Sequence, residues 1–599
     1  MSDQTLNAST PPRVNHIKWI ARLWNEKRLL IVVLFMLTLL SSAVAVTYPY
    51  LSKRLLDMMQ AIMEKPGTDD PMRAVDRLLM VFVAVGLGGL VASLFPGIRG
   101  VTNSVFEHAL RMKYWKKVLA KDHRFFSHFS SGDIVTRLTD DLYDFPKLSW
   151  FLCSGIFRAV ESISKVAFCL GAMLLLDWRL TLFSLIPLPI MIALFYSTQD
   201  RIYDTFQKNQ QAISAINTRL EMSFSGVRII KSYACEAKYS RFFRDVLGRR
   251  WNTEMDVAKL EVVLHLIYQY IDYTAQVGIV FAGGFMAVTG RISIGTFYAF
   301  YTYLSMLIYP ILDIPQLFVS GKRAFVNIDR LEEMAAFPQE PKPDSPVPVD
   351  TIETIALRGV SFAYGDRASE ALSGINLDIR RGQRIAVLGP VGSGKSTLVK
   401  LMLGVLKPAA GTIRVNDIDL HDVDIESYRA RVGYVPQEAL LFSGTLRENV
   451  DMGSDAPDDQ TFATAMEAAQ LSDELASFPA GQDTVVGQRG VSLSGGQKQR
   501  MAIARAVARR PQLLIFDDST ASLDAANEEQ LMRRLDELSP EMSFVIVSHR
   551  LSTLQYVDSV LFLDGGRQLG FGTHEELLNL PWYRAFIETH MKSAASGRL

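Results

Sequence analysis

The chain has 599 residues, too many for one hydrophobic core, so at least two domains are expected. Hydrophobic residues make up 49% of it, and the mean hydropathy of +0.13 is high for a soluble protein. The formal net charge of +0 gives no overall attraction to nucleic acid. The three cysteines, Cys153, Cys169 and Cys235, show neither a disulfide framework nor a metal-ligand spacing.

Residues 1–28 form an N-terminal segment that begins with a polar tail and lacks the pattern of a signal peptide. From Val14 to Arg28, aromatic and aliphatic residues are mixed with basic ones. This mixture predicts either an amphipathic helix on the membrane surface or the beginning of a helix that continues into the first span. The pattern does not choose between the two.

Residues 29–325 contain apolar runs that each approach the ~20 residues needed to cross hydrocarbon. They predict a polytopic membrane domain with six transmembrane helices, at Leu29–Tyr48, Leu78–Pro96, Gly155–Leu176, Leu180–Tyr196, Val262–Val288 and Phe297–Phe318. The connections between the second and third runs and between the fourth and fifth are long and rich in Lys and Arg. Because this excess marks the cytoplasmic side, we expect a multi-pass protein of the cell (inner) membrane with its N-terminus and its C-terminal half in the cytoplasm.

The long basic connections have helical periodicity, for example from Phe206 to Ala234, so the spans are expected to continue as helices well past the bilayer. Short turns at their ends are candidates for contacting another domain, near Gly132–Asp144 and Ser225–Ser232. Several charges fall within the spans. Arg158, Glu161 and Lys165 are spaced to pair along one helix face, whereas Asp272 and Asp313 are candidates for lining a polar pathway.

Residues 326–351 are interpreted as a linker, because the segment from Pro338 to Val349 is rich in proline and therefore stiff and extended. Beyond it, residues 352–590 alternate short β-type runs with helical patterns and predict an α/β nucleotide-binding domain. Residues 591–599 form a C-terminal tail.

A glycine-rich loop is the strongest motif of the second half. It reads Gly389-Pro390-Val391-Gly392-Ser393-Gly394-Lys395-Ser396, between the apolar run Ile385–Leu388 and a predicted helix that starts at Lys395 and includes Thr397. A strand, a glycine loop and a helix N-terminus together form a phosphate-binding loop. Lys395 is then placed to reach the terminal phosphates and the Ser396 hydroxyl to bind Mg²⁺.

Polar residues follow further predicted strands. Asp517 ends the run Leu513–Asp517, Gln437 follows a strand that ends at Val435, and His549 follows one that ends at Val547. Parallel sheets place ligand sites at such strand ends, and Asp517 is expected beside the Mg²⁺ of a bound nucleotide.

Two more features belong with these residues. The turn Leu493-Ser494-Gly495-Gly496-Gln497 precedes a predicted helix and forms a second anion-binding end. Tyr364 precedes the phosphate loop and is either a ring that stacks on a purine or a tyrosine at the end of a strand.

The phosphate loop, Gln437, the signature turn, Asp517, Ser522-Leu523-Asp524 and His549 follow one another along the chain. With these motifs the chain resembles an ATP-binding cassette (ABC) exporter half-transporter of the multidrug and lipid exporter type, over nearly its whole length. The likeness is greatest to heterodimeric bacterial multidrug exporters. It implies a six-span membrane domain fused to an α/β P-loop domain, and export of amphiphilic small molecules from a lipid membrane. It also implies two chains that enclose two ATP molecules with Mg²⁺, each site combining the phosphate loop of one chain with the signature turn 493–497 of the other.

The resemblance also assigns roles to single residues. It implies that Tyr364 stacks on adenine, that Gln437 senses Mg²⁺ together with Ser396 and Asp517, and that His549 contacts the γ-phosphate. It places Ser522-Leu523-Asp524 in the D-loop, the segment that follows the catalytic carboxylate in this family.

One position departs from the family pattern. The residue after Asp517, usually a Glu that polarises the attacking water, is Asp518. Its side chain is one methylene shorter, which displaces the carboxylate by about 1 Å, and such a displacement can lower a rate ~10²-fold. We therefore expect a site that binds ATP and hydrolyses it poorly, in one subunit of a heterodimer whose partner retains the Glu. The alternative is that the backbone adjusts and the site hydrolyses normally.

A homodimeric exporter and an importer of metal chelates on the same fold both remain compatible with the sequence. A membrane-bound regulator that binds ATP without transport is disfavoured by the intact Lys395, Asp517, signature turn and His549. A soluble cassette ATPase is excluded by the spans.

Overall fold

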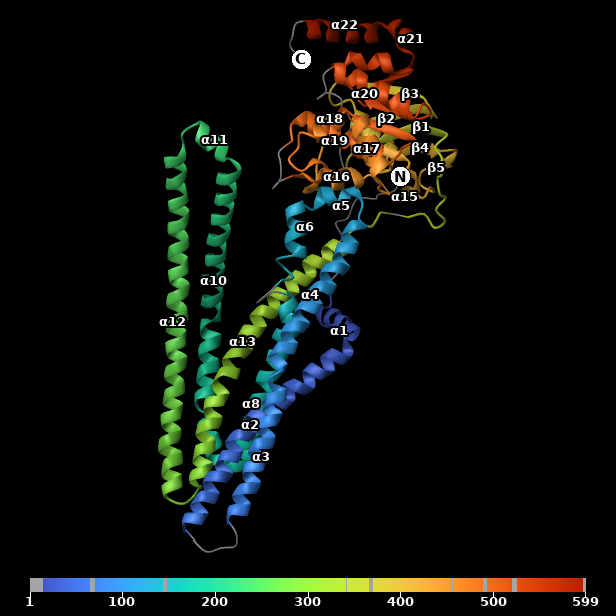
Figure 1. Cartoon of the computed structure of the whole chain (residues 1–599). Helices are drawn as coiled ribbons and strands as arrows, with labels where there is room; N and C mark the ends of the chain where they lie inside the picture. Colours follow the sequence, from blue (N-terminus) through green and yellow to red (C-terminus); the bar gives the residue numbers. More distant parts are fainter. Residues whose placement is uncertain are drawn as a thin grey trace. The chain divides into compact units, whose positions relative to one another are not determined.

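The structure is a computed structural model that describes residues 14–64, 71–143, 148–340, 342–365, 370–454, 456–487, 493–519 and 525–595. It divides into two compact units (Figure 1). The first comprises Met1–Ala120 and His128–Phe337, and the second comprises Lys121–Ser127 and Pro338–Leu599.

The first unit is helical. Its helices are α1 (His16–Glu26), α2 (Arg28–Glu64), α3 (Pro71–Ala92), α4 (Phe95–Leu119), α6 (Ser131–Leu138), α7 (Leu148–Trp150), α8 (Ile156–Leu176), α9 (Trp178–Ser184), α10 (Pro187–Ser225), α11 (Val227–Ser232), α12 (Glu236–Val288) and α13 (Ile294–Ala336). Within the described residues, four helical stretches are long and apolar enough to cross a membrane: Arg28–Glu64, Val75–Leu119, Leu148–Leu176 and Glu236–Val288. The predicted fourth and sixth spans fall in α9–α10 and in α13.

Helix α1 is separate from the first span. It ends at Glu26, and Lys27, with φ −126°, interrupts the helical backbone before α2 begins at Arg28. Ile20 and Leu23 are buried on its apolar side. The expectation of a helix that runs without a break into the first span is therefore wrong.

The helices extend far beyond a bilayer, as predicted. Helix α12 has 53 residues, or about 80 Å at 1.5 Å per residue, against a hydrocarbon core of ~30 Å. Helix α10 has 39 residues and runs beside α12, with the short α11 joining their ends (Figure 1). The predicted turn at 225–232 is thus the short helix α11. The fourth predicted span is divided, because Pro187 cannot continue the hydrogen bonding of α9 and instead begins α10.

The other predicted contact turn, near Gly132–Asp144, contains the short helix α6. Its helix α6 belongs to the first unit, whereas the segment that belongs to the nucleotide-binding unit is Lys121–Ser127. That segment carries most of α5 (His123–His128), and Lys121 forms a β-bridge with Gln339. Burial lowers the pKa of His123, and the charge of Lys400 lowers it further. Helix α6 itself contacts α13 within the first unit.

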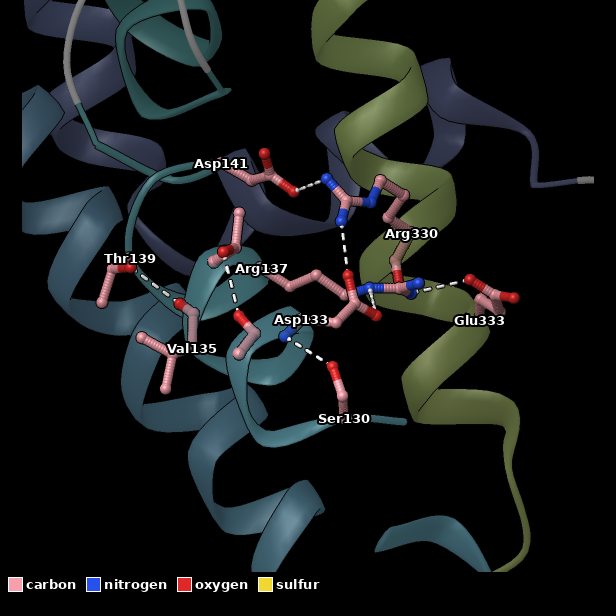
Figure 2. Close-up of polar contacts among 10 residues, drawn as sticks. Ser130, Asp133, Val135, Arg137, Thr139, Asp141, Arg330 and Glu333 are labelled. Atoms are coloured by element: carbon pink, nitrogen blue, oxygen red, sulfur yellow. Dashed lines mark hydrogen bonds and ion pairs between the residues drawn. The ribbon is translucent and has the colours of Figure 1, made fainter. Parts of the chain in front are cut away.

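Helix α6 is held to α13 by a set of ion pairs that we call the ionic clamp (Figure 2). Arg137, 7% exposed, lies 2.9 Å from the Asp133 carboxylate and 2.7 Å from that of Glu333. Arg330 of α13 pairs with Asp133 at 2.7 Å and with Asp141 at 2.5 Å. Burial opposes the ionisation of Asp133, but the hydrogen bonds and charges of Arg137 and Arg330 outweigh it and hold its pKa below the usual value. The clamp fixes the end of α13 that leads into the linker.

The charges within the spans pair in part as predicted. Lys165 and Glu161 lie 2.6 Å apart within α8, and Arg99 of α4 approaches Glu161 to 3.7 Å. Asp272 accepts a hydrogen bond from the Gln276 amide at 2.8 Å. The side chain of Asp313 lies outside the described residues.

The second unit is built on a large mixed sheet. Its strands are β1 (Thr354–Phe362), β2 (Leu372–Arg380), β3 (Arg384–Leu388), β4 (Ala410–Val415), β5 (Ile418–Asp419), β6 (Val432–Val435), β7 (Gly444–Thr445), β8 (Val485–Val486), β9 (Leu513–Asp517), β10 (Ser543–Val547), β11 (Ser559–Asp564) and β12 (Arg567–Gly572). The main sheet has the order β5-β4-β1-β2-β12-β11-β3-β10-β9-β6. Strand β1 is continuous but has a shift in its pairing with β2 after Leu357.

Helices cover the faces of this sheet. They are α14 (Lys395–Met402), α15 (Ile425–Ala430), α16 (Leu446–Asp451), α17 (Asp459–Ala468), α18 (Ser472–Leu475), α19 (Gly495–Ala508), α20 (Ala525–Leu538), α21 (His574–Leu578) and α22 (Pro581–Ala595). One buried core packs α14 against β1, β2 and β3, and another packs α16, α17 and α19 against β6 and β9. The strands β6, β9, β10 and β3 are adjacent and parallel, so their carboxyl ends meet at one edge.

The contribution of the ionic clamp to holding α6 against α13 can be measured. Replacing Arg137 by Met leaves Asp133 and Glu333 without this partly buried cation, which is expected to destabilise the α6–α13 contact by roughly 3 kcal/mol. Hydrogen exchange of residues 131–138 should accelerate by about 100-fold. Arg250→Met is the matched control, since its pair with Glu254, at 3.8 Å and with both partners exposed, contributes little. Equal exchange in both variants would mean that the clamp does not fix α6.

Candidate functional site

The phosphate loop joins β3 to α14, as the sequence predicts. Gly394 is the N-cap of α14 with φ +98°, and a Cβ there would lie 2.6 Å from the Ala371 carbonyl oxygen. Gly389 has φ +150°, and a Cβ there would overlap the carbonyl oxygen of Leu563. Only glycine fits these two positions without strain. Between Gly389 and Gly394 run Pro390, Val391, Gly392 and Ser393, which complete a backbone cradle at the N-terminus of a helix.

Lys395 lies within this cradle. Its ammonium donates to the carbonyl oxygens of Gly389 and Pro390, each at 2.8 Å, and the residue is 7% exposed. Burial lowers the pKa of Lys395, while the carboxylates of Asp518 and Asp517 oppose that shift. The loop thus holds a cation where an anionic ligand would meet backbone N–H groups and a helix dipole.

Ser396 and Asp517 come together at the same place. The Ser396 hydroxyl donates to the Asp517 carboxylate at 2.9 Å, and Asp517 is 4% exposed at the end of β9. An oxygen-only donor set of a hydroxyl and a carboxylate is the kind that Mg²⁺ prefers. Gln437 is exposed two residues after β6, the strand next to β9, and could supply a third oxygen. The residues present therefore fit a magnesium ion.

Asp518 has an unusual backbone. Its φ is +52°, a left-handed conformation that costs a non-glycine residue about 1–2 kcal/mol. Its N–H donates to the Val547 carbonyl oxygen of the neighbouring strand at 2.9 Å, which anchors this conformation. The Asp518 carboxylate lies 3.8 Å from Nε2 of His549. The two residues predicted to act on the γ-phosphate side are thus neighbours.

The protonation of Asp518 follows from its surroundings. Burial raises the pKa of the carboxyl, the charges of His549 and Lys395 lower it, and Asp517 raises it, with a net increase. A carboxylate with a raised pKa is a better proton acceptor than an exposed one. Its chemistry suits a general base, and the reach of its shorter side chain decides whether it meets the attacking water.

Tyr364 lies beside the loop. Its hydroxyl is 3.2 Å from the Thr397 hydroxyl in the first turn of α14, and its ring packs edge-to-face on Phe362. Part of the ring packs against the hydrophobic core. Tyr364 thus follows strand β1 and is also adjacent to the phosphate-loop helix, while its stacking on a purine stays a prediction.

The signature turn begins α19. Ser494 is the N-cap, and it forms a reciprocal capping box with Gln497, while Leu493 is buried. The Gln497 amide also donates to Glu474 at 2.9 Å. The helix begins at Gly495, three residues earlier than the sequence pattern indicated, because the capping box includes the two glycines. Within the described residues, no hydrogen bond or ion pair joins residues 493–497 to the chain's own phosphate loop.

Two residues near the site, Tyr434 and Ser519, were missed by the sequence analysis. The Tyr434 hydroxyl donates to Asp517 at 3.4 Å, and the hydroxyls of Ser393 and Ser519 are buried without a hydrogen-bond partner in the described part of the chain. Their proximity to motif residues was the available signal. An orphaned buried hydroxyl in the phosphate loop is a group that a bound phosphate would satisfy. The predicted residues Ser522, Leu523 and Asp524 lie outside the described residues.

The comparisons with known proteins agree with this geometry. Residues 31–311 match the family "ABC transporter transmembrane region", and residues 372–521 match the family "ABC transporter". The probable multidrug resistance ABC transporter ATP-binding/permease protein YheI of Bacillus subtilis is 32% identical over 489 residues, which are 81% of this chain and 83% of that protein. The ATP-dependent lipid A-core flippase of Chromohalobacter salexigens is 28% identical, over 89% of this chain and 91% of that protein.

A solved structure has the same fold. A bacterial Atm1-family ABC exporter with ATP bound superimposes with a TM-score of 0.77, at 22% identity, over 94% of this chain and 98% of that one. A helical transmembrane domain fused to a nucleotide-binding domain with a mixed sheet is thus common to both. The chain therefore belongs to the ABC transporters, as a half-transporter that pairs with another ABC chain and couples ATP hydrolysis to transport across a membrane.

Proposed function

We propose that this chain exports amphiphilic, drug-like or lipid-like small molecules across the cytoplasmic membrane, as one of two non-identical subunits, and that its own phosphate-loop site is catalytically weakened. The relatives named for multidrug resistance and for lipid A-core flipping support the substrate class. The excess of Lys and Arg in the long connections supports a cytoplasmic N-terminus and nucleotide-binding domain.

The proposal of a heterodimer rests on Asp518, which stands where the family usually has Glu. Its backbone is held by Val547 and by the strand ends on either side, so it has little freedom to advance the shorter side chain. A carboxylate about 1 Å short of its productive position can lower the hydrolysis rate ~10²-fold. Lys395, Ser396 and Asp517 are unaffected by this change, so ATP binding is retained.

The proposal includes a magnesium ion bound with ATP. Ser396 and Asp517 would hold the ion, with Gln437 from the neighbouring strand, and the bound ion would neutralise charge on the transferred phosphoryl group. His549 would contact the γ-phosphate and Tyr364 the adenine. The signature turn 493–497 makes no hydrogen bond or ion pair to the chain's own phosphate loop among the described residues, and it would complete the site whose phosphate loop comes from the partner.

The proposal predicts a dependence of ATP turnover on both the partner and residue 518. The chain alone should turn over ATP slowly, and co-expression with a partner that has the Glu should restore turnover. Asp518→Glu should raise the turnover of the chain alone, by up to ~10²-fold. Steady-state ATPase assays on the purified chain and on the pair measure this.

Asp417→Glu provides the control for that substitution, since Asp417 is exposed, also has a positive φ of +66°, and lies in the turn between β4 and β5, at the opposite edge of the main sheet from β6. Brisk turnover by the chain alone, together with no gain from Asp518→Glu, would instead establish the homodimeric exporter.

A second prediction uses the asymmetry of the pair. Ser494→Arg blocks the signature turn that faces the competent site, so it should lower turnover of the pair more than tenfold. Lys395→Ala removes the cation from the weakened site and should lower turnover much less. Equal losses from the two variants would mean that both sites are equivalent. Binding of a fluorescent ATP analogue shows whether each variant still loads its own site.

Direction of transport separates export from chelate import. Inverted vesicles should accumulate an amphiphilic dye in the presence of ATP, and the Lys395→Ala/Ser494→Arg double variant should not. Accumulation of the dye or of a metal chelate in right-side-out vesicles with internal ATP would contradict export.

A further inference from the structure

A cavity in the first unit lies outside the nucleotide site. It has a volume of about 370 Å³ and is formed by α1, α4 and one residue of α13. Its lining residues are Val14, Asn15, Lys18, Trp19, Arg22, Leu23, Lys113, Lys117 and Glu332. All three helices belong to the same unit, so the cavity is a property of that unit alone. It lies where α1 precedes the first span, α2.

The lining is strongly cationic. Lys18, Arg22, Lys113 and Lys117 give four positive charges, and Glu332 gives one negative charge, so the net charge of the lining is 4 − 1 = +3. None of the four cations makes an ion pair within the described part of the chain. Glu332 is already engaged, because the Trp19 indole N–H and the Tyr114 hydroxyl both donate to its Oε1. The carboxylate therefore fixes α1 to α13 and leaves the cations uncompensated.

The spacing of these cations is unfavourable without an anion. Lys18 and Arg22 are four residues apart on α1, and Lys113 and Lys117 are four residues apart on α4. Like charges at this spacing repel on a helix surface, and here two such pairs line one cavity. The Lys117 ammonium lies 5.3 Å from the centre of the Tyr114 ring, which orients it. An anion within the cavity would relieve both repulsions.

Apolar features beside the cations indicate that the anion carries a hydrocarbon part. Ile17, next to Lys18 on α1, is 77% exposed, and Leu29 at the start of the first span is 80% exposed. Trp19 presents an indole ring to the cavity, a side chain typical of the membrane interface. Helices with basic residues beside such apolar ones bind anionic lipid at the headgroup level.

We infer that this cavity, the α1 pocket, binds the phosphate-bearing headgroup of an anionic membrane lipid, with Lys18, Arg22, Lys113 and Lys117 as its cationic contacts. The lipid chains would lie against the exposed apolar residues of α1 and α2. This site is separate from the ATP site and does not depend on which subunit hydrolyses ATP.

The test is lipid binding by the full-length chain in its assembled form, measured by native mass spectrometry. Phosphatidylglycerol is titrated against phosphatidylcholine, and the apparent Kd of the first bound lipid is compared. Phosphatidylglycerol should bind more tightly, and Lys18→Gln/Lys117→Gln should weaken it roughly 10- to 30-fold. The matched control Lys27→Gln/Lys116→Gln removes two cations from the same helical region outside the cavity and should change the Kd less than twofold.

Further variants and a competition experiment distinguish lipid binding from misfolding and from binding of a soluble phosphate ester. Lys18→Arg/Lys117→Arg keeps the charges and should keep the affinity, which shows that a loss in the Gln variant is not misfolding. Arg22→Gln is a milder single variant if the double variant does not assemble. Equal weakening by the control pair, or equal binding of phosphatidylcholine, would overturn the proposal. Displacement of the lipid by millimolar glycerol 3-phosphate would also overturn it, since the pocket would then take a soluble phosphate ester.

Discussion

The pairing of four parallel strands is the constraint on which the nucleotide site depends. In the order β3-β10-β9-β6, Val387 pairs with Val547, Val547 with Asp517, and Phe516 with Val435. This register brings the phosphate loop, Asp517 and the residues after β10 and β6 to one edge. A one-residue slip of a strand would invert its side chains, so the buried apolar faces of the sheet also fix the polar edge. Core packing and ligand geometry are thus set by the same interactions.

The strained backbone of Asp518 is also held by the pairing of these parallel strands. The residue leaves β9 in a left-handed conformation that is held by the Val547 carbonyl of the adjacent strand, and it lies against His549 from the end of that strand. Such strain persists only when the surrounding structure over-determines it. The backbone here is determined by two strands rather than by a flexible loop, which is why the length of the side chain matters.

Local patterns in the sequence predicted the phosphate loop, the strands that precede Asp517 and His549, and the long helices, because each depends on residues close together in the chain. The order of the strands is not local and came only with the structure. The same holds for the ionic clamp, whose Arg137 and Glu333 are 196 residues apart. Only the structure shows that α6, within the predicted turn at 132–144, is held to α13, since a local pattern shows that a face is buried and not against what. No Gly or Pro marks the break at Lys27.

The capping of Ser494 has a consequence for assembly. A serine hydroxyl has one donor and two acceptor positions, and here the oxygen accepts from the Gln497 N–H. The O–H remains able to donate to an incoming phosphate oxygen, so capping and phosphate binding do not compete. The rotamer of the serine and the first turn of α19 are ordered within the isolated subunit. In the proposed assembly, little conformational entropy would then be lost at that point when two subunits close on a nucleotide, and the association would be governed more by the charge of the nucleotide than by the ordering of the turn that meets it.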